Sequence, residues 1–237
     1  MLKAALVTLL SIPTIVHAGA WPRAEGETYA LIQGTTGDDD WLSLYAERGT
    51  SAALTFGIAV GGRSNLITEW DRDARIRVFA RRAVPLPWDS WAMSVETGVG
   101  LDVRTGRDVD APLPRTMTRG SVGVSVGRGF ATAWGGGWTN LDLRHDRPLE
   151  DPDPARHHDF DEARDSLAWT VGLKPAPKIA LEMNVHAERG MDHTAYAIGP
   201  TWQRTFDRLG DGRIGIAWQD DGDAHLTIGL SRVFGGR

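Results

Sequence analysis

Two short patterns in the sequence have residue types and spacings that could support hydrolysis. Asp223 and His225 are separated by one residue, so on a β-strand both side chains would point to the same face. Residues 123–127 read Gly-Val-Ser-Val-Gly, the Gly-x-Ser-x-Gly pattern of a nucleophilic serine. Such a serine needs a sharp strand-to-helix turn, whereas these residues continue a strand alternation with no helix after them. Neither pattern has a clear second catalytic partner, and we predict that the protein is not an enzyme.

A long acidic stretch contains the candidate metal ligands. Adjacent histidines near carboxylates can bind a transition metal, but the spacing is not that of a dedicated calcium loop. The candidates are Asp151, Asp153, His157, His158 and Asp159. The sequence favours a solvated acidic loop here, with a metal site as the alternative, and implies no cofactor.

The N-terminal residues predict export. Lys3 precedes an apolar run that is too short for a typical membrane-spanning helix, and small residues follow at Ala18, Gly19 and Ala20. We therefore expect a signal peptide over residues 1–20 and an exported domain over 21–237. Cleavage after Ala18 or after Ala20 suits a signal peptidase equally well. The absence of cysteine excludes disulfides and thiolate metal sites, and the net charge of −5 gives no reason to expect a nucleic-acid partner.

The rest of the chain alternates with a period of two residues. In residues 54–61, for example, Leu54, Phe56, Ile58 and Val60 alternate with Thr, Gly or Ala. Neighbouring side chains on a strand point to opposite faces, so this pattern predicts an all-β protein. The expected strands are 27–35, 41–48, 51–62, 73–83, 90–104, 117–127, 129–143, 165–174, 178–188, 193–206, 212–219 and 224–234.

The connections between these strands indicate how the sheet closes. Through the middle of the chain, long connections alternate with tight ones, such as a turn at Arg128, and 144–164 is the longest. Short turns at one end and longer loops at the other are typical of outer-membrane barrels. We therefore predict a closed antiparallel transmembrane β-barrel of about twelve strands. Both termini should lie on the periplasmic side, Trp138 should lie near the outer end, and Gly135–Gly137 should hold a bulge.

The last strand, residues 226–234, ends in Phe234. Together with the signal peptide and the alternating strands, it makes the mature chain resemble the β-barrel proteins of the Gram-negative outer membrane. The resemblance is architectural and rests on no family motif. It implies contact with outer-membrane lipid and lipopolysaccharide, and assembly by the barrel-assembly machinery. The His-x-Ser motif of outer-membrane phospholipases does not occur, and the oligomeric state is left open.

If the apolar residues face lipid, the residues of opposite parity line the interior. The charged or polar candidates are Arg75, Arg77, Arg81, Glu96, Asp102, Lys174, Glu182, Asn184, His186, Glu188 and Arg213. They predict a narrow channel or passive permeation protein for small polar solutes. The alternatives are a barrel without transport, serving as a structural or adhesive element of the envelope, and a secreted soluble all-β domain.

Overall fold

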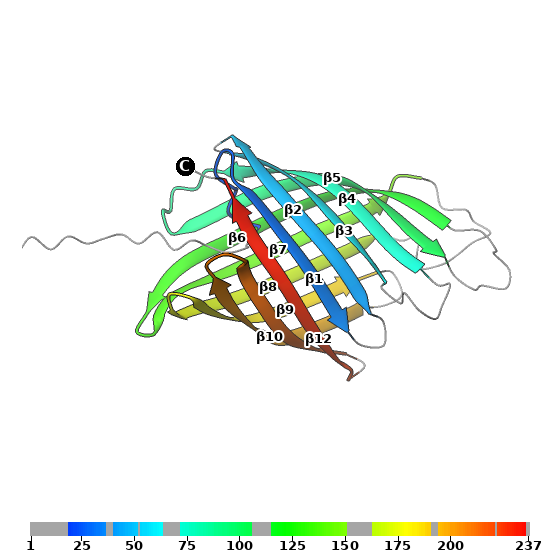
Figure 1. Cartoon of the computed structure of the whole chain (residues 1–237). Helices are drawn as coiled ribbons and strands as arrows, with labels where there is room; N and C mark the ends of the chain where they lie inside the picture. Colours follow the sequence, from blue (N-terminus) through cyan, green and yellow to red (C-terminus); the bar gives the residue numbers. More distant parts are fainter. Residues whose placement is uncertain are drawn as a thin grey trace, which may run out of the picture.

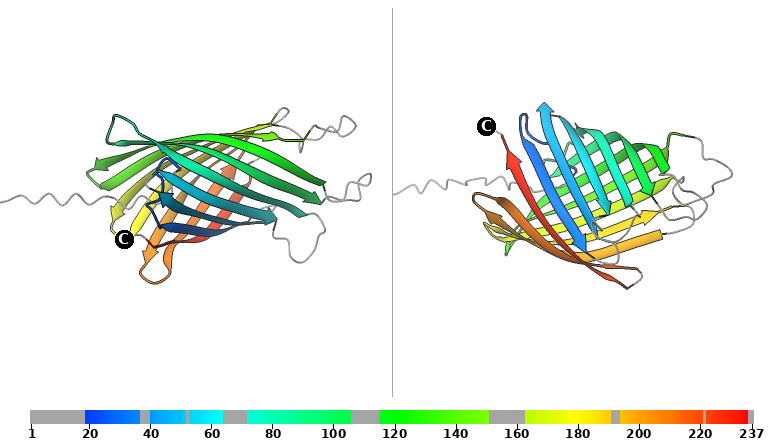
Figure 2. Two further views of the ribbon diagram at one scale, coloured as in Figure 1. Left: turned by 90° about the horizontal axis from the view of Figure 1, so that it is seen from above. Right: turned by 45° about the vertical axis from the view of Figure 1, so that its right-hand side comes forward.

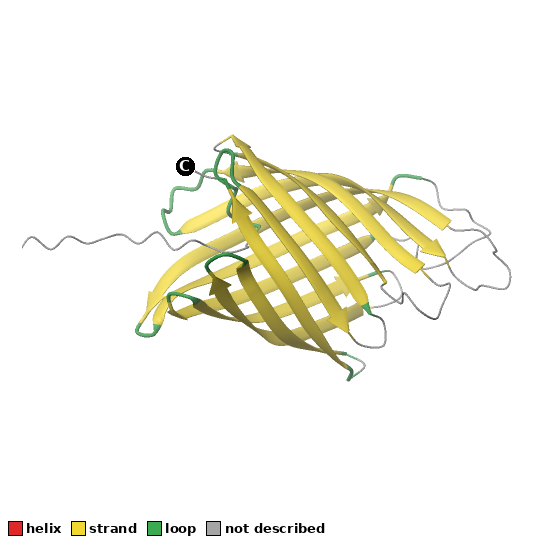
Figure 3. Cartoon of the chain, viewed as in Figure 1, coloured by secondary structure: helices red, strands yellow, loops and turns green. Residues whose placement is uncertain are grey.

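A computed structural model describes residues 19–36, 40–51, 53–63, 72–105, 115–150, 163–190, 194–220 and 222–235. The side chains of residues 63, 72, 73, 104, 105 and 115 are not described. The described residues form strands and turns only (Figure 3). The strands are β1 (Thr28–Thr36), β2 (Trp41–Ser51), β3 (Leu54–Arg63), β4 (Arg72–Val84), β5 (Trp91–Thr105), β6 (Arg115–Thr132), β7 (Gly135–Pro148), β8 (Arg164–Ala176), β9 (Ile179–Arg189), β10 (Thr194–Phe206), β11 (Gly210–Gln219) and β12 (Ala224–Phe234).

The strands form one closed ring (Figure 1). Each strand pairs antiparallel with the next, and β12 closes the ring on β1, with Thr28 opposite Phe234 and Thr36 opposite Leu226. Closure leaves no unpaired sheet edge, which is how a barrel satisfies its backbone hydrogen bonds. The predicted fold class, an all-β closed antiparallel barrel of twelve strands, is confirmed, and a two-sheet sandwich is excluded.

The two ends of the barrel differ in their connections. β1 begins and β12 ends at the same rim, here called the terminal end, and the opposite rim is called the loop end (Figure 2). The turns at the terminal end are short, as at residues 133–134 and 177–178. The connection between β7 and β8, at the loop end, is the longest in the chain. The predicted metal ligands Asp151, Asp153, His157, His158 and Asp159 belong to this connection and lie outside the described residues.

The alternation in sequence separates an apolar outer face from a polar inner face. Val78 and Val99, which are register partners near the middle of β4 and β5, are 53% and 50% exposed on the outside. Thr55 and Ser94 are fully buried on the inside. Apolar side chains exposed in a continuous outer band are the arrangement a lipid environment requires. No helix of the described residues is long and apolar enough to cross a membrane.

One turn lies elsewhere than predicted. β6 continues through Arg128 to Thr132, and its pairing with β7 runs without a register shift from Thr132 opposite Gly135 to Arg119 opposite Pro148. Gly135 has φ +125°, a backbone conformation that favours glycine, so the chain reverses just before it. The predicted turn at Arg128 and the predicted bulge are therefore wrong. As a result Trp138 lies close to the terminal end, where it points inward and is only 3% exposed.

Candidate functional site

A cavity of about 300 Å³ opens inside the barrel toward the loop end. Its charged lining comes from β4, β5, β6, β7, β8 and β9. The inward-pointing charged residues of these neighbouring strands lie at a similar level along the barrel axis. The charged residues are Arg75, Arg77, Arg119, Arg144, Arg164, Asp102, Asp146 and Glu188. Five arginines and three carboxylates line this cavity, and because Arg77 pairs with Glu96 outside the lining, the excess charge is +1 (4 − 3). We call it the arginine cavity.

Asp102 is the main counter-charge of the arginine cavity. Its Oδ2 atom lies 2.9 Å from Nε of Arg119, 3.8 Å from Nε of Arg75 and 3.9 Å from Nη1 of Arg164. Arg164 is also 3.9 Å from Glu188, so neither of its ion pairs is close. One carboxylate therefore serves three guanidinium groups, and a dissolved anion would find donors with spare capacity here.

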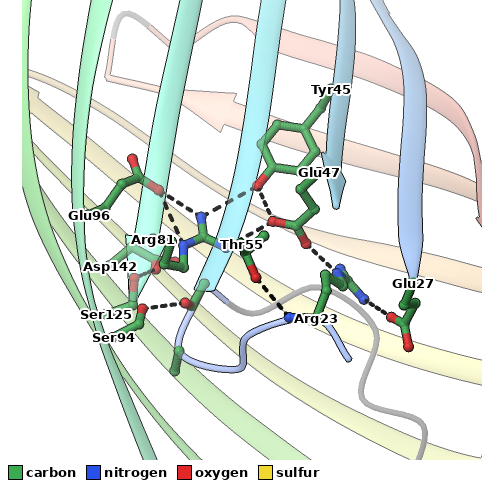
Figure 4. A network of polar contacts seen from close by, with 12 residues as sticks. Arg23, Glu27, Tyr45, Glu47, Thr55, Arg81, Ser94, Glu96, Ser125 and Asp142 are labelled. Carbon is green, nitrogen blue, oxygen red and sulfur yellow. Dashed lines mark hydrogen bonds and ion pairs between the residues drawn. The ribbon is translucent and has the colours of Figure 1, made fainter. Parts of the chain in front are cut away.

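A second, compensated cluster of charges lies closer to the terminal end. Arg81 donates to Oε2 of Glu47 at 2.9 Å and to Oε2 of Glu96 at 2.8 Å (Figure 4). Arg77 also donates to Glu96, on its other oxygen. Arg23 also pairs with Glu47 and with Glu27, so three arginines face three carboxylates and the cluster has no net charge. The cluster holds β2, β4 and β5 together on the lumen side.

Aromatic rings fill the space beside this cluster. The rings of Tyr45 and Phe79 stack with centroids 5.7 Å apart. The guanidinium Cζ atoms of Arg77 and Arg81 lie 4.7 and 5.2 Å from the centroid of the Phe79 ring. Gly57 makes room for the ring of Phe79, since a Cβ at Gly57 would lie 2.2 Å from its Cζ. The packed layer narrows this side of the lumen.

A second cavity of about 230 Å³ lies along the opposite wall, and its lining includes Gln33, Asn184, His186 and Arg213. Arg213 donates to Oε2 of Glu182 at 2.9 Å. Lys174 lies 5.7 Å from the ring of Trp138. This wall carries polar groups around small side chains, and its charged residues include Arg213, Glu182 and Lys174, of which the first two form an ion pair.

The structure thus places the candidate interior residues on two walls. Arg75 pairs in register with Asp102, and Arg81 with Glu96. Arg77 lies opposite Gly100 in the register, and its side chain reaches along the strand to Glu96. The candidates Lys174, Glu182, Asn184, His186, Glu188 and Arg213 lie on β8, β9 and β11.

Sequence reasoning missed six charged strand residues of the lumen, including Asp142, which lies within the predicted strand 129–143. Arg119 has the same parity on β6 as Ser121 and Ser125, so alternation could have identified it. Arg144, Asp146 and Arg164 fell inside the predicted loop 144–164, whereas β7 and β8 extend over them. Glu47, on β2, shares the parity of Tyr45 and was overlooked. Extending the predicted strands by one to three residues would have recovered Arg144, Asp146 and Arg164.

The patterns that suggested hydrolysis occupy ordinary strand positions. Ser125 continues β6, and its hydroxyl donates to Asp142 of the neighbouring β7. His225 is buried on β12 and lines neither cavity. Among the described residues, no cluster of three or more His, Asp or Glu side chains could hold a metal ion.

A segment before β1 enters the lumen at the terminal end. We call Gly19–Gly26 the inserted segment. The backbone N of Arg23 donates to Oγ1 of Thr55 on β3 at 3.0 Å, and its guanidinium binds Glu47 on β2 (Figure 4). At the other end of the segment, Ala20 is completely buried. No pattern in the sequence indicates that this segment contacts the barrel.

Comparison with solved structures places the fold among outer-membrane barrels. The chain is similar to the KdgM porin (8% identity, 87% of this chain and 99% of that chain, TM-score 0.58). It is also similar to the NanC porin (11% identity, 88% and 100%, TM-score 0.60). A third similar structure is outer membrane phospholipase A from Escherichia coli (8% identity, 91% and 98%, TM-score 0.51). No protein-family model and no curated protein matches the sequence. The chain therefore has the fold of a bacterial outer-membrane β-barrel.

Proposed function

We propose that the protein is a narrow outer-membrane channel that passively admits small anionic solutes. The observation that carries the proposal is the arginine cavity, in which five arginines face three carboxylates. A cavity with one sign of excess charge and low-dielectric walls raises the local concentration of the opposite ion. Planar guanidinium groups also suit carboxylates, which they can bind through two parallel hydrogen bonds.

The location in the outer membrane follows from the fold and the outer face. Large apolar side chains such as Val78, Val99 and Ile228 are about half exposed on the outside. These would face lipid, and the loop end would face the exterior because the terminal end holds the short turns. Contact with lipopolysaccharide and assembly by the barrel-assembly machinery belong to the same proposal, as does removal of a signal peptide.

The class of solute is proposed from charge and size. One structure of KdgM contains disordered oligogalacturonate, an acidic oligosaccharide. The arginine cavity, at about 300 Å³, has room for a single acidic sugar rather than for a bulky solute. We therefore expect monomeric acidic sugars and small carboxylates to pass more readily than neutral sugars of the same size.

Uptake into proteoliposomes tests this proposal. Galacturonate should enter faster than galactose, which has the same ring without the charge. Arg119→Gln should reduce this preference, since it removes a cavity charge. Arg232→Gln, which removes an arginine from the exposed outer side of β12 beside Phe234, should not. Equal rates for the two sugars, or an equal effect of both substitutions, would contradict anion selection in the cavity.

A barrel without transport remains the second candidate, because one observation favours it. The inserted segment occupies the lumen at the terminal end, where Ala20 is completely buried. If that segment never leaves, the barrel is closed and serves the envelope in another way. Shortening the chain to remove Gly19–Arg23 should produce conductance in a channel protein and none in a closed structural barrel.

A further inference from the structure

The inserted segment spans the lumen from one wall to the other. It leaves β1, contacts Thr55 on β3 through Arg23, and reaches β5 and β7 at Gly19 and Ala20. In a ring of twelve strands, β7 is diametrically opposite β1. The segment therefore crosses the full width of the barrel at its terminal end.

The tip of the inserted segment fits a polar recess in the far wall. Oγ of Ser94 donates to the carbonyl oxygen of Gly19 at 2.6 Å, and the backbone N of Ala20 donates to Oδ1 of Asn140 at 3.3 Å. A Cβ added at Gly19 would lie 2.5 Å from Oδ1 of Asp142 and 2.7 Å from Oγ of Ser125. A side chain at position 19 would require the Asp142 carboxylate and the Ser125 hydroxyl to shift.

Within the described part of the chain, Asp142 is a carboxylate without a direct ion pair, although Arg81 is near enough to interact with it electrostatically. It accepts hydrogen bonds from Ser125 and from Asn140. Among the described residues, no lysine, arginine or histidine forms an ion pair with it, unlike Glu47, Glu96 and Asp102. Carboxylates enclosed by protein are normally paired with a positive charge.

The backbone nitrogen of Gly19 lies in the neighbourhood of this carboxylate. From the Cβ distance, its Cα lies within about 4 Å of Oδ1 of Asp142, and its nitrogen within about 5.5 Å, since backbone bonds are about 1.5 Å long. A small rotation at the chain end would bring a terminal ammonium into contact. An α-amino group is protonated at neutral pH.

We propose that the exported chain is cleaved between Ala18 and Gly19, and that Asp142 binds the α-ammonium group this creates. Hydrolysis adds water across the peptide bond, leaving a carboxylate on Ala18 and an amine on Gly19, which takes up a proton. Processing thereby creates the charge that anchors the tip of the inserted segment to the far wall of the lumen. The inference rests on the proposed export of the chain but not on its conductance.

The alternative cleavage, after Ala20, would leave the polar recess in the far wall without the residues that occupy it. It would remove the carbonyl of Gly19, to which Ser94 donates, and the backbone N–H of Ala20, which donates to Asn140. Buried polar groups that lose their partners are costly. The sequence does not distinguish the two cleavage sites. The contacts of Gly19 and Ala20 with the far wall favour cleavage after Ala18.

Two measurements on protein purified from outer membranes test the proposal. Intact mass and N-terminal sequencing should give a chain that starts at Gly19, and a chain starting at Trp21 would overturn the inference. The second measurement is the rate at which 2-pyridinecarboxaldehyde, a reagent selective for terminal amines, labels the folded barrel. Asp142→Asn should raise this rate about tenfold or more, because it removes a charged hydrogen-bond partner.

The control variant is Asp211→Asn. Asp211 also lies at the terminal end of the barrel, but its carboxylate accepts from Thr205 on the neighbouring strand, so labelling should stay at the wild-type rate. Heat-modifiable gel migration checks that each barrel is folded. If Asp142→Asn does not fold, Ser94→Ala replaces it and should also speed labelling, since Ser94 holds the carbonyl of Gly19. Wild-type labelling rates in the folded variant, or an equal increase in the control, would overturn the anchor. Neither readout requires the barrel to conduct.

Discussion

An arginine on the outer face of β8 should destabilise the barrel far more than one on the inner face. Val171 and Thr170 are neighbours in β8 and point to opposite sides. Val171 lies opposite Met183, which is 45% exposed on the outside. Thr170 donates to Oδ1 of Asn184 at 2.9 Å, and Asn184 lines the second cavity. The pair tests the proposed lipid-facing surface within a single strand.

The expected loss in the free energy of unfolding depends on how deep residue 171 lies in the bilayer. β8 has 13 residues, so at about 3.4 Å per residue and a tilt of about 35–45° it rises roughly 31–36 Å. Val171 is near the middle of this strand and hence near the bilayer midplane. Arginine on the lipid face at that depth costs about 2–4 kcal/mol, which changes the unfolding equilibrium constant roughly 30-fold to 700-fold. Thr170→Arg should cost about 1 kcal/mol, the value of the lost hydrogen bond.

Urea unfolding of the barrel in phospholipid vesicles, followed by tryptophan fluorescence, measures both variants. The free energy of unfolding should fall more for Val171→Arg than for Thr170→Arg. Equal losses, or a larger loss for Thr170→Arg, would show that the apolar outer face does not meet lipid.

Three further predictions address the lumen, its packing and the topology. Glu96→Gln combined with Asp102→Asn should shift the reversal potential toward that of an anion-selective channel. The shift should shrink as the salt concentration rises, because the screening length falls from about 10 Å at 0.1 M to about 3 Å at 1 M. An unchanged reversal potential would place both carboxylates off the ion path. Gly57→Val should displace Phe79 and cost about 1–3 kcal/mol in urea unfolding, and an unchanged free energy of unfolding would contradict the packing described for that ring. An epitope inserted after Pro154 should be labelled on intact cells, whereas labelling only after permeabilisation would reverse the orientation.

The fold could be predicted from sequence because alternation is a local property. The alternation within one strand shows which of its side chains face outward. Val78 and Val99 can therefore be assigned to the outer face without knowing which strands are paired. The register between strands was less accessible, since it depends on turn geometry. The turn placed at Arg128 lies at residues 133–134 instead, because the alternation continues past Arg128 and only Gly135 requires the special backbone conformation.

The interior of the barrel was harder to predict than its wall. Arg144 and Arg164 fall in the predicted loop because the charged residues around them interrupt the apolar–polar alternation at the ends of β7 and β8. The inserted segment could not have been foreseen, since its partners Ser94 and Asn140 are 75 and 120 residues away from Gly19 and Ala20. Contacts across a closed lumen leave no periodic pattern in either segment. Parity identifies inward residues but does not show which opposite residues they meet.

The most direct test of the proposed function is the reversal potential of single channels of the mature protein in a planar bilayer under a KCl gradient. An excess of arginine in the lumen predicts a conducting barrel whose reversal potential lies toward that of chloride. A reversal potential toward that of potassium would contradict the proposal. So would the absence of conductance both in the wild-type protein and after removal of Gly19–Arg23.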